Sequence, residues 1–161
     1  FAEAATATYA RSYNIKTKII RRFNTYGPNM QLNDGRVVTN LIVQALNNQD
    51  LTIYGDGSQT RSFSYVSDTV AGIIAMMNSE HYEVFNIGNP YEMTVKELAE
   101  TILKLTDSSS KIIFKPLPND DPQQRRPDIT KAREKLHWEP KIDLETGLNR
   151  TIEWIKKELS K

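Results

Sequence analysis

The chain has 161 residues and is 39% hydrophobic, so it is long enough to bury one modest core and does not require two independent domains. Its 21 Lys and Arg residues and 20 Asp and Glu residues are mixed along the chain and give a formal net charge of +1, which argues against nucleic acid or an anionic membrane as the main partner. The chain contains no cysteine, which excludes a disulfide scaffold, a thiolate metal site and a cysteine nucleophile.

The first third of the chain is typical of a helix followed by a strand. Residues 2–13 are rich in alanine and contain no Gly or Pro, which predicts a helix, and residues 15–24 have the β-branched density of a strand. Turn-forming residues fill 24–35, and residues 36–49 then place their apolar side chains on one helical face. This order predicts an α/β protein.

The middle of the chain predicts a β-hairpin, two helices and a strand. Residues 54–63, YGDGSQTRSF, have two strand-like arms around a Gly-rich turn. Ser67 or Asp68 is expected to cap a helix over 69–79, and a short strand is expected in YEVFNIG. Thr94 and Glu97 have the spacing of a capping box at the start of another helix.

The last third predicts a strand, a polar loop and two helices. The strand KIIFKPL is cut off by Pro116, NDDPQQRRP is expected to be an extended loop, and Asp128 is expected to begin a short helix that ends near HWEP. The final helix has apolar residues at spacings of three and four. They are Leu144, Leu148, Ile152, Ile155 and Leu159.

Histidines and paired acids are weak candidates for chemistry in this sequence. His81 and His137 lie far apart and neither belongs to a cluster with metal-ligand spacing, so we expect structural roles and no metal site. Asp120 and Asp121 are neighbours in an extended segment, where successive side chains point apart. We therefore expect loop charges rather than an acid/base couple.

Several arginines are placed where proteins hold phosphate groups. Arg36 follows a glycine at a predicted helix start, Arg61 lies on the hairpin arm, and Arg125 and Arg126 precede a proline. Helix N-termini, Gly-rich turns and guanidinium groups together bind diphosphates through N–H donors and bidentate charge. Surface ion pairing with nearby carboxylates is the alternative for each arginine, and composition alone does not decide between the two.

Four ordered blocks of sequence carry a resemblance to a known family. These blocks are RRFNTYGPNMQLNDGRVVTNLIVQAL, LTIYGDGSQTRSFSYVSDTVAGI, FNIGNP and DDPQQRRPDITKAREKLHWEPKIDLETGLNRTI. They resemble the extended short-chain dehydrogenase/reductase family of NAD-dependent epimerases and dehydratases, over essentially the whole chain. They are most similar to the branch that converts UDP-glucuronate into UDP-xylose. The dTDP-glucose 4,6-dehydratases, or other NDP-sugar epimerases and dehydratases, are the alternative enzymes, and a non-catalytic nucleotide-binding module is a third possibility.

The resemblance implies how the chain is organised. Family members have an NAD-binding Rossmann domain followed by a smaller lobe that binds the nucleotide sugar. Residues 1–35 are expected to be the tail of the Rossmann domain, and residues 36–161 mainly the sugar-nucleotide lobe. The family's Gly-rich dinucleotide turn and its Tyr-x-x-x-Lys pair have no counterpart in the chain, so we expect them upstream of Phe1.

The resemblance also implies an activity and its setting. NAD would oxidise C4 of the sugar, CO2 would leave the resulting β-keto acid, and the retained NADH would reduce C4 again. Because the hydride steps need the absent Tyr and Lys, the 161-residue chain alone is expected to be inactive. The parent protein is expected to be a homodimer. The cytoplasm is the favoured compartment, and the Golgi lumen, which houses some family members, stays open.

Individual residues match functional positions of the family. Asn24 and Arg61 resemble contacts to the substrate diphosphate, and Thr39 and Tyr54 resemble residues that line the nucleotide pocket. Arg125 matches the arginine that the decarboxylating branch places at the sugar carboxylate and the acid step.

Three further residues belong to the predicted site, and two positions depart from the family pattern. Arg36 resembles a cofactor-side arginine, and Tyr9 and Gln59 complete the predicted substrate-binding set. Arg22 stands where relatives carry an apolar or aromatic residue, and Asn29 stands where an arginine is usual. Both departures concern the packing on the nicotinamide side.

Overall fold

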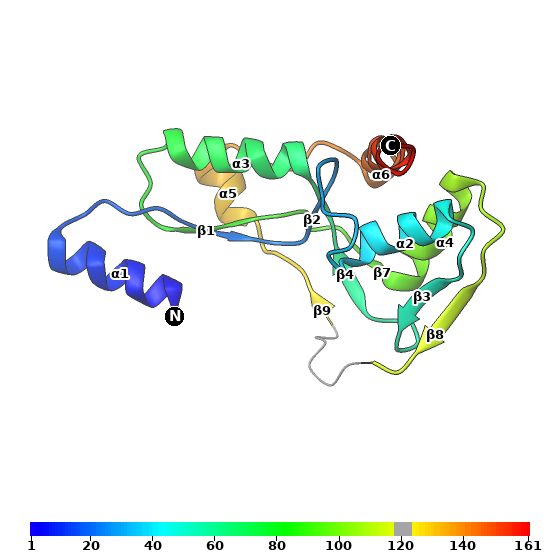
Figure 1. The fold of residues 1–161 in the computed structure, drawn as a ribbon. Helices are drawn as coiled ribbons and strands as arrows, with labels where there is room; N and C mark the ends of the chain where they lie inside the picture. The colour runs from blue at the N-terminus through cyan, green and yellow to red at the C-terminus, as the bar shows by residue number, and fades with distance from the viewer. Residues whose placement is uncertain (118–123) are drawn as a thin grey trace.

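The computed structural model describes residues 1–117 and 124–161 as a mixed α/β protein (Figure 1). Its elements in chain order are α1 (Ala2–Tyr13), β1 (Ile19–Arg22), β2 (Thr25–Tyr26), α2 (Val37–Leu46), β3 (Leu51–Tyr54), β4 (Thr60–Ser62), β5 (Ser64–Tyr65), α3 (Val66–Asn78), β6 (Val84–Ile87), β7 (Glu92–Thr94), α4 (Val95–Thr106), β8 (Ile112–Lys115), β9 (Gln124–Arg125), α5 (Thr130–Leu136) and α6 (Leu144–Leu159). The predicted α/β class is confirmed.

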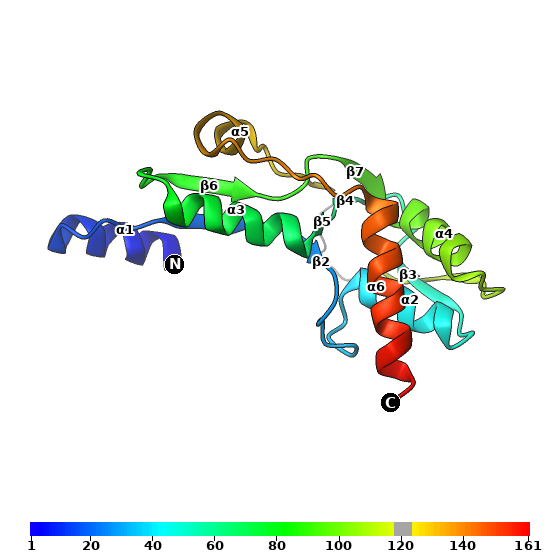
Figure 2. The same ribbon diagram turned by 90° about the horizontal axis from the view of Figure 1, so that it is seen from above.

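The elements gather in two halves with separate cores (Figures 1 and 2). In one half, β1 pairs in parallel with β6, and α3 and α5 pack near this pair around Phe85, Ile87 and Trp138. In the other half, α2, α4 and α6 enclose a larger core beside β3 and β8. The short parallel pair β2–β5 lies between these halves, and Tyr26 and Tyr65 of that pair belong to the larger core.

The larger core follows from the helical periodicity of three segments. Each of α2, α4 and α6 repeats apolar residues at spacings of three and four, which produces one apolar face per helix. Fully buried side chains of these faces include Ile42, Leu98, Ile102, Leu148 and Ile155, each at 0% exposure. The predicted helices and their inward faces are confirmed.

The capping box at the start of α4 is confirmed. Thr94 Oγ1 accepts the Glu97 N–H at 3.0 Å, and the Glu97 carboxylate accepts the Thr94 N–H at 2.7 Å. Two N–H groups that would otherwise lack a partner at the helix start are therefore satisfied.

The predicted hairpin over residues 54–63 is wrong, because its two arms belong to different sheets. β3 pairs in parallel with β8, whereas β4 pairs with β7 and β9. Gly55 and Gly57 have positive φ angles of 76° and 79°, which redirect the chain between the sheets. The turn is tied to α4, since Gln59 accepts the Val95 N–H at 3.1 Å through its carbonyl oxygen.

The predicted cap of α3 by Ser67 or Asp68 is also wrong. The helix begins at Val66, and its N-cap Tyr65 makes no side-chain capping bond. Asp68 is buried and its Oδ2 instead accepts the Ile142 N–H at 2.9 Å. The carboxylate thus anchors the segment between α5 and α6, a long-range use that local sequence does not indicate.

The predicted polar loop over 119–127 is partly a strand. Gln124–Arg125 form β9, which pairs in parallel with β4. Asp120 and Asp121 lie outside the described residues. Asp128 accepts the Thr130 N–H at 2.9 Å through Oδ1, just before α5.

Some apolar surface remains uncovered in the half that contains α1. α1 has no buried residue, and Val70, Ile74 and Met77 of α3 are 46%, 51% and 67% exposed. Within residues 1–117 and 124–161, no helix has the length and apolar character needed to cross a membrane.

Candidate functional site

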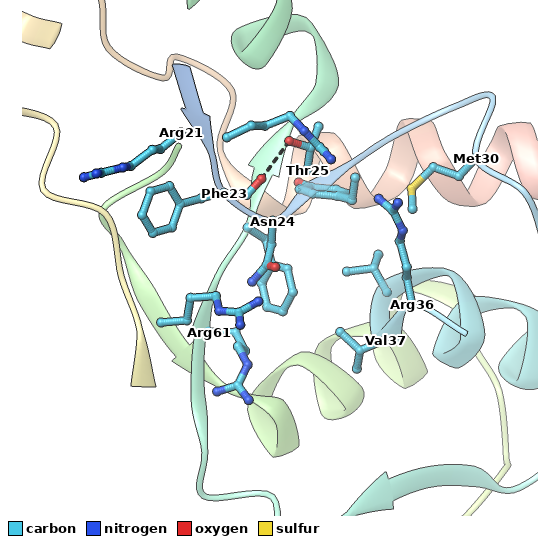
Figure 3. Close-up of a pocket in the computed structure, with 13 residues that line it drawn as sticks. Arg21, Phe23, Asn24, Thr25, Met30, Arg36, Val37 and Arg61 are labelled. Carbon is cyan, nitrogen blue, oxygen red and sulfur yellow. Dashed lines mark hydrogen bonds between the residues drawn. The ribbon is translucent and has the colours of Figure 1, made fainter. Parts of the chain in front are cut away.

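A cavity of about 510 Å³ lies where the two halves meet (Figure 3). Its described lining residues are Arg21, Arg22, Phe23, Asn24, Thr25, Tyr26, Met30, Arg36, Val37, Val38, Arg61, Phe63 and Arg125. They come from the end of β1, from β2 and the loops beside it, from the start of α2, from β4 and the residue after it, and from β9. Parallel strands commonly present ligand-binding residues at their carboxyl ends, and the residues at the carboxyl end of β1 line this cavity.

An adjoining cavity of about 400 Å³ extends this site. The two cavities share Arg36, Val37, Arg61 and Arg125, and the second adds Tyr54 and Gln59. The structure therefore brings together most of the residues predicted from sequence. They are Asn24, Arg36, Tyr54, Gln59, Arg61 and Arg125.

Arg61 is held by its strand in the wall shared by both cavities. β4 lies between β7 and β9, with Arg61 opposite Met93 on one side and Arg125 on the other. The residue is 8% exposed, and its Nη1 donates to the Thr60 carbonyl at 2.8 Å. Desolvation at this position strengthens the interaction of a guanidinium with an anion.

Arg125 lies beside Arg61 on the neighbouring strand. Parallel pairing of β4 with β9 places the two residues in register, so their side chains start from adjacent backbones. Among the residues that the structure describes, Arg125 has no ion-pair partner, and its carbonyl accepts the Ser62 hydroxyl at 3.4 Å. Two neighbouring guanidinium groups can bind an anion larger than a single carboxylate.

Arg36 enters the cavity from the start of α2, across from Asn24 and Arg61 (Figure 3). The side-chain Nε of Arg36 lies 3.0 Å from Asp34 Oδ2, and the backbone N–H of Arg36 donates to Asp34 Oδ1 at 3.0 Å. The carboxylate of Asp34 offsets the unfavourable placement of a cation at a helix N-terminus. Arg36 therefore has an ion pair and also lines the site.

Asn24 follows β1 and points toward Arg61 (Figure 3). Its carbonyl accepts the Ser64 N–H at 2.8 Å, which holds the loop against β5. Its side-chain amide can donate and accept hydrogen bonds in the cavity.

Arg21 and Arg22 line the cavity, although charge and spacing did not predict them as site residues. Arg21 makes a two-point ion pair with Glu3, at 2.7 Å from both Nε and Nη2, and so connects β1 to α1. The signal that could have found them is their position at the carboxyl end of a parallel strand.

Two predicted site residues line neither cavity. Thr39 is fully buried in α2, and its Oγ1 lies 3.6 Å from Sδ of Met30, which does line the cavity. Tyr9 lies on α1, is 60% exposed and stacks on Tyr13 with ring centroids 5.3 Å apart. α1 contacts β1 through the Glu3–Arg21 pair but lies well away from β4 and β9, which carry Arg61 and Arg125 (Figure 1).

The titratable groups in the cavity wall favour binding over proton transfer. Burial raises the pKa of the Tyr26 phenol above its ordinary value, and its Oη donates to the Leu144 carbonyl at 3.2 Å. None of the described residues that line the main cavity is acidic or a histidine. Among the described residues, no cluster of His, Cys, Asp and Glu could hold a metal ion.

Comparison with known proteins identifies the family. The model of the family described as GDP-mannose 4,6 dehydratase matches residues 1–151 of the chain. The chain belongs to this family. The match agrees with the resemblance to extended short-chain dehydrogenases/reductases, whose epimerase and dehydratase structures have the same fold.

Curated relatives of this family member include proteins named UDP-glucuronic acid decarboxylase. UDP-glucuronic acid decarboxylase 1 of Arabidopsis thaliana is 51% identical over 151 residues, which are 94% of this chain and 35% of the relative. UDP-glucuronic acid decarboxylase 1 of Danio rerio is 49% identical over 98% of this chain and 38% of the relative.

Solved structures of the same fold superimpose closely. UDP-glucose 4-epimerase of Thermotoga maritima, solved with UDP-glucose, has a TM-score of 0.94 at 35% identity over 98% of this chain and 51% of its own. UDP-glucuronic acid 4-epimerase of Bacillus cereus, solved with UDP-glucuronic acid and NAD, has a TM-score of 0.91 at 30% identity over 97% of this chain and 50% of its own. The family member thus spans about half of these chains and little more than a third of the two curated relatives.

Proposed function

We propose that this chain is the nucleotide-sugar-binding part of an NAD-dependent UDP-glucuronate decarboxylase that makes UDP-xylose. The observation that carries the proposal is the gathering of five arginines in the wall of one cavity whose described lining residues include no acid. Such a wall suits a ligand with several negative charges. UDP-glucuronate has a diphosphate and a sugar carboxylate, and the curated relatives are named for decarboxylating it.

Each residue of the site has a role in this proposal. Arg61, buried in the shared wall, and Asn24 would hold the diphosphate, while Tyr54 and Gln59 of the adjoining cavity would contact the nucleoside. Arg125 would orient the sugar carboxylate and stabilise negative charge as it moves to oxygen during loss of CO2.

Two predicted residues have weaker structural support for a role. Thr39 would act on the nucleotide pocket through its contact with Met30. No described contact links Tyr9 to the cavity, so its assignment to the substrate site stays a prediction.

The sequence of this chain lacks the Gly-rich motif of a dinucleotide-binding turn. Its seven glycines include no Gly-x-Gly-x-x-Gly turn, and only Arg36 matches a cofactor-side position. NAD, when bound, would accept hydride from the sugar and return it. We propose that residues outside this chain hold NAD, that residues 1–35 belong to that domain and 36–161 mainly to the sugar-nucleotide lobe, and that the parent protein is a homodimer.

The competing assignment is a 4,6-dehydratase, since the matching family model has that description. A dTDP-glucose 4,6-dehydratase from Bacillus anthracis has the same fold with a TM-score of 0.89, but its identity to this chain is 26%, about half that of the decarboxylases. A neutral hexose also offers no carboxylate for Arg125. These two differences favour the decarboxylase.

Calorimetric titration of the chain with UDP-glucuronate, UDP and dTDP-glucose tests the proposal. We expect UDP-glucuronate to bind more tightly than UDP, Arg61→Ala to weaken both, and Arg125→Ala to remove the difference between them. Arg11→Ala, an exposed arginine on α1, is the matched control and should change nothing. Tighter binding of dTDP-glucose, or no binding of any of the three, would overturn the assignment.

An activity assay tests the remaining part. The chain incubated with NAD and UDP-glucuronate should release no UDP-xylose, because it has no Tyr-x-x-x-Lys pair. Appearance of UDP-xylose would contradict the proposal that the hydride-transfer steps need residues outside this chain.

A further inference from the structure

The carboxylate of Glu92 joins the strands that carry the two central arginines. Its oxygens accept hydrogen bonds from Thr60 Oγ1 at 2.8 Å and from Gln124 Nε2 at 2.9 and 2.8 Å. Thr60 precedes Arg61 on β4, and Gln124 precedes Arg125 on β9. One side chain on β7 therefore contacts both strands.

These contacts lie on the face of the sheet opposite to the arginines. Successive side chains of a strand alternate between faces, so Thr60 and Arg61 point to opposite sides, as do Gln124 and Arg125. The register places Thr60 beside Gln124 and Arg61 beside Arg125. Glu92 thus joins the strands on the face of the sheet away from the cavity, while the guanidinium groups of Arg61 and Arg125 lie on the cavity face.

We propose that Glu92 is a positioning residue that fixes the spacing between Arg61 and Arg125 by holding β9 against β4. The proposal rests on the proposed function, because the two arginines are taken to bind one anionic ligand together. Glu92 itself lines neither cavity that contains these arginines.

The pairing of β9 with β4 is short enough to need such support. It consists of two residue pairs. Apart from the contacts through Glu92, a described side-chain hydrogen bond between these strands runs from Ser62 Oγ to the Arg125 carbonyl and is long, at 3.4 Å. Hydrogen bonds to a carboxylate are stronger than bonds between neutral groups. The Glu92 side chain is 17% exposed, which limits competition from water, and Arg126 adds a weak ion pair at 3.9 Å.

Loss of the carboxylate should therefore reduce the fraction of molecules in which both arginines are placed to bind. Apparent affinity falls in proportion to that fraction. We expect Glu92→Ala to raise the dissociation constant for UDP-glucuronate about tenfold. Amide hydrogens of residues 124–126 should exchange faster than in the unchanged chain.

A reciprocal exchange separates positioning from general stability. Glu92→Gln combined with Gln124→Glu restores an amide-to-carboxylate pair in the opposite direction, and should bring affinity and exchange back to within about twofold of the original values. Glu83→Gln is the matched control, because Glu83 is a surface carboxylate paired with Lys131 and Lys135 away from the cavity. It should change neither measurement.

The outcomes distinguish this proposal from the proposed function. If Arg61→Ala weakens binding but Glu92→Ala does not, or if the reciprocal exchange fails to restore what Glu92→Gln loses, the positioning role is wrong. If the unchanged chain binds no UDP-glucuronate, the proposed function fails, and hydrogen exchange alone decides about Glu92. Unaltered amide hydrogen exchange at residues 124–126 in both Glu92→Ala and Glu92→Gln would then overturn the positioning role.

Discussion

Gly147 in α6 allows that helix to approach the tyrosines of the β2–β5 pair. A Cβ atom at this position would lie 2.1 Å from Tyr26 Oη and 3.0 Å from Tyr65 Cδ2. Tyr26 is 2% exposed and packs edge-on against Tyr65 with ring centroids 5.7 Å apart, so its ring has little room to move. The substitution Gly147→Ala therefore has two opposite effects on stability: a gain in helix propensity and a loss from the clash with Tyr26.

The packing cost should exceed the gain in propensity. Alanine in place of glycine in a helix interior stabilises a protein by about 1 kcal/mol. Displacing the Tyr26 ring would break its hydrogen bond to the Leu144 carbonyl, at about 1 kcal/mol, and overpacking a core costs about 1–3 kcal/mol. We expect Gly147→Ala to lower the free energy of unfolding by about 1–3 kcal/mol.

Urea unfolding followed by circular dichroism measures this change, and thermal unfolding should show a lower Tm by on the order of 5 °C. Asn149→Ala is the matched control, because Asn149 is exposed on the same helix and the change should stabilise slightly. If Gly147→Ala stabilises the chain as much as Asn149→Ala, the close approach of α6 to Tyr26 is refuted.

Three further results are expected from other parts of the molecule. Ile102→Ala in the larger core should lower the free energy of unfolding by about 2–5 kcal/mol in urea titrations, since Ile102 is 0% exposed, and an unchanged midpoint would contradict that burial. The Thr94 backbone N–H lowers the pKa of Glu97 in the folded chain below its ordinary value of 4.5. The ionised Glu97 therefore stabilises the fold above pH 4.5, and this contribution is lost as the pH falls through the pKa of the folded state. The acid-induced loss should shrink in Glu97→Gln, and equal losses in both chains would refute the linkage. Exposed Ile74 and Met77 should promote self-association that rises with concentration in sedimentation experiments, and a monomer at every concentration would count against it.

The sequence was most informative where local pattern and tertiary packing agree. Spacing within one or two turns predicts the helix over 144–159 and the capping box at Thr94, and alanine-rich composition predicts the helix over 2–13, so local sequence is enough for all three. The hairpin failed because Leu51 and Ile53 gain more from burial beside β8, about sixty residues later, than from pairing across a local turn. Asp68 failed as a cap for the same reason, since its partner Ile142 is distant in sequence.

The candidate site shows where prediction from sequence ends. A guanidinium after a Gly-rich turn indicated Arg61, but nothing local indicates that residues 124 and 125 pair with β4, because a two-residue strand has no periodicity to detect. The resemblance selected Arg125 without giving the reason for its position. The structure supplies that reason in the register of Arg61 with Arg125.

The parallel pairing of β4 with β9 has a chemical consequence. In a parallel pair, residues in register direct their side chains to the same face, so Arg61 and Arg125 bring two positively charged groups to one side of the sheet. The hydrogen bonds of Glu92 to Thr60 and Gln124 on the opposite face help to hold the same two strands together. If the proposed function is right, a bound diphosphate sugar would contact both guanidinium groups, so ligand and carboxylate would stabilise the same strand pairing from opposite faces of one sheet.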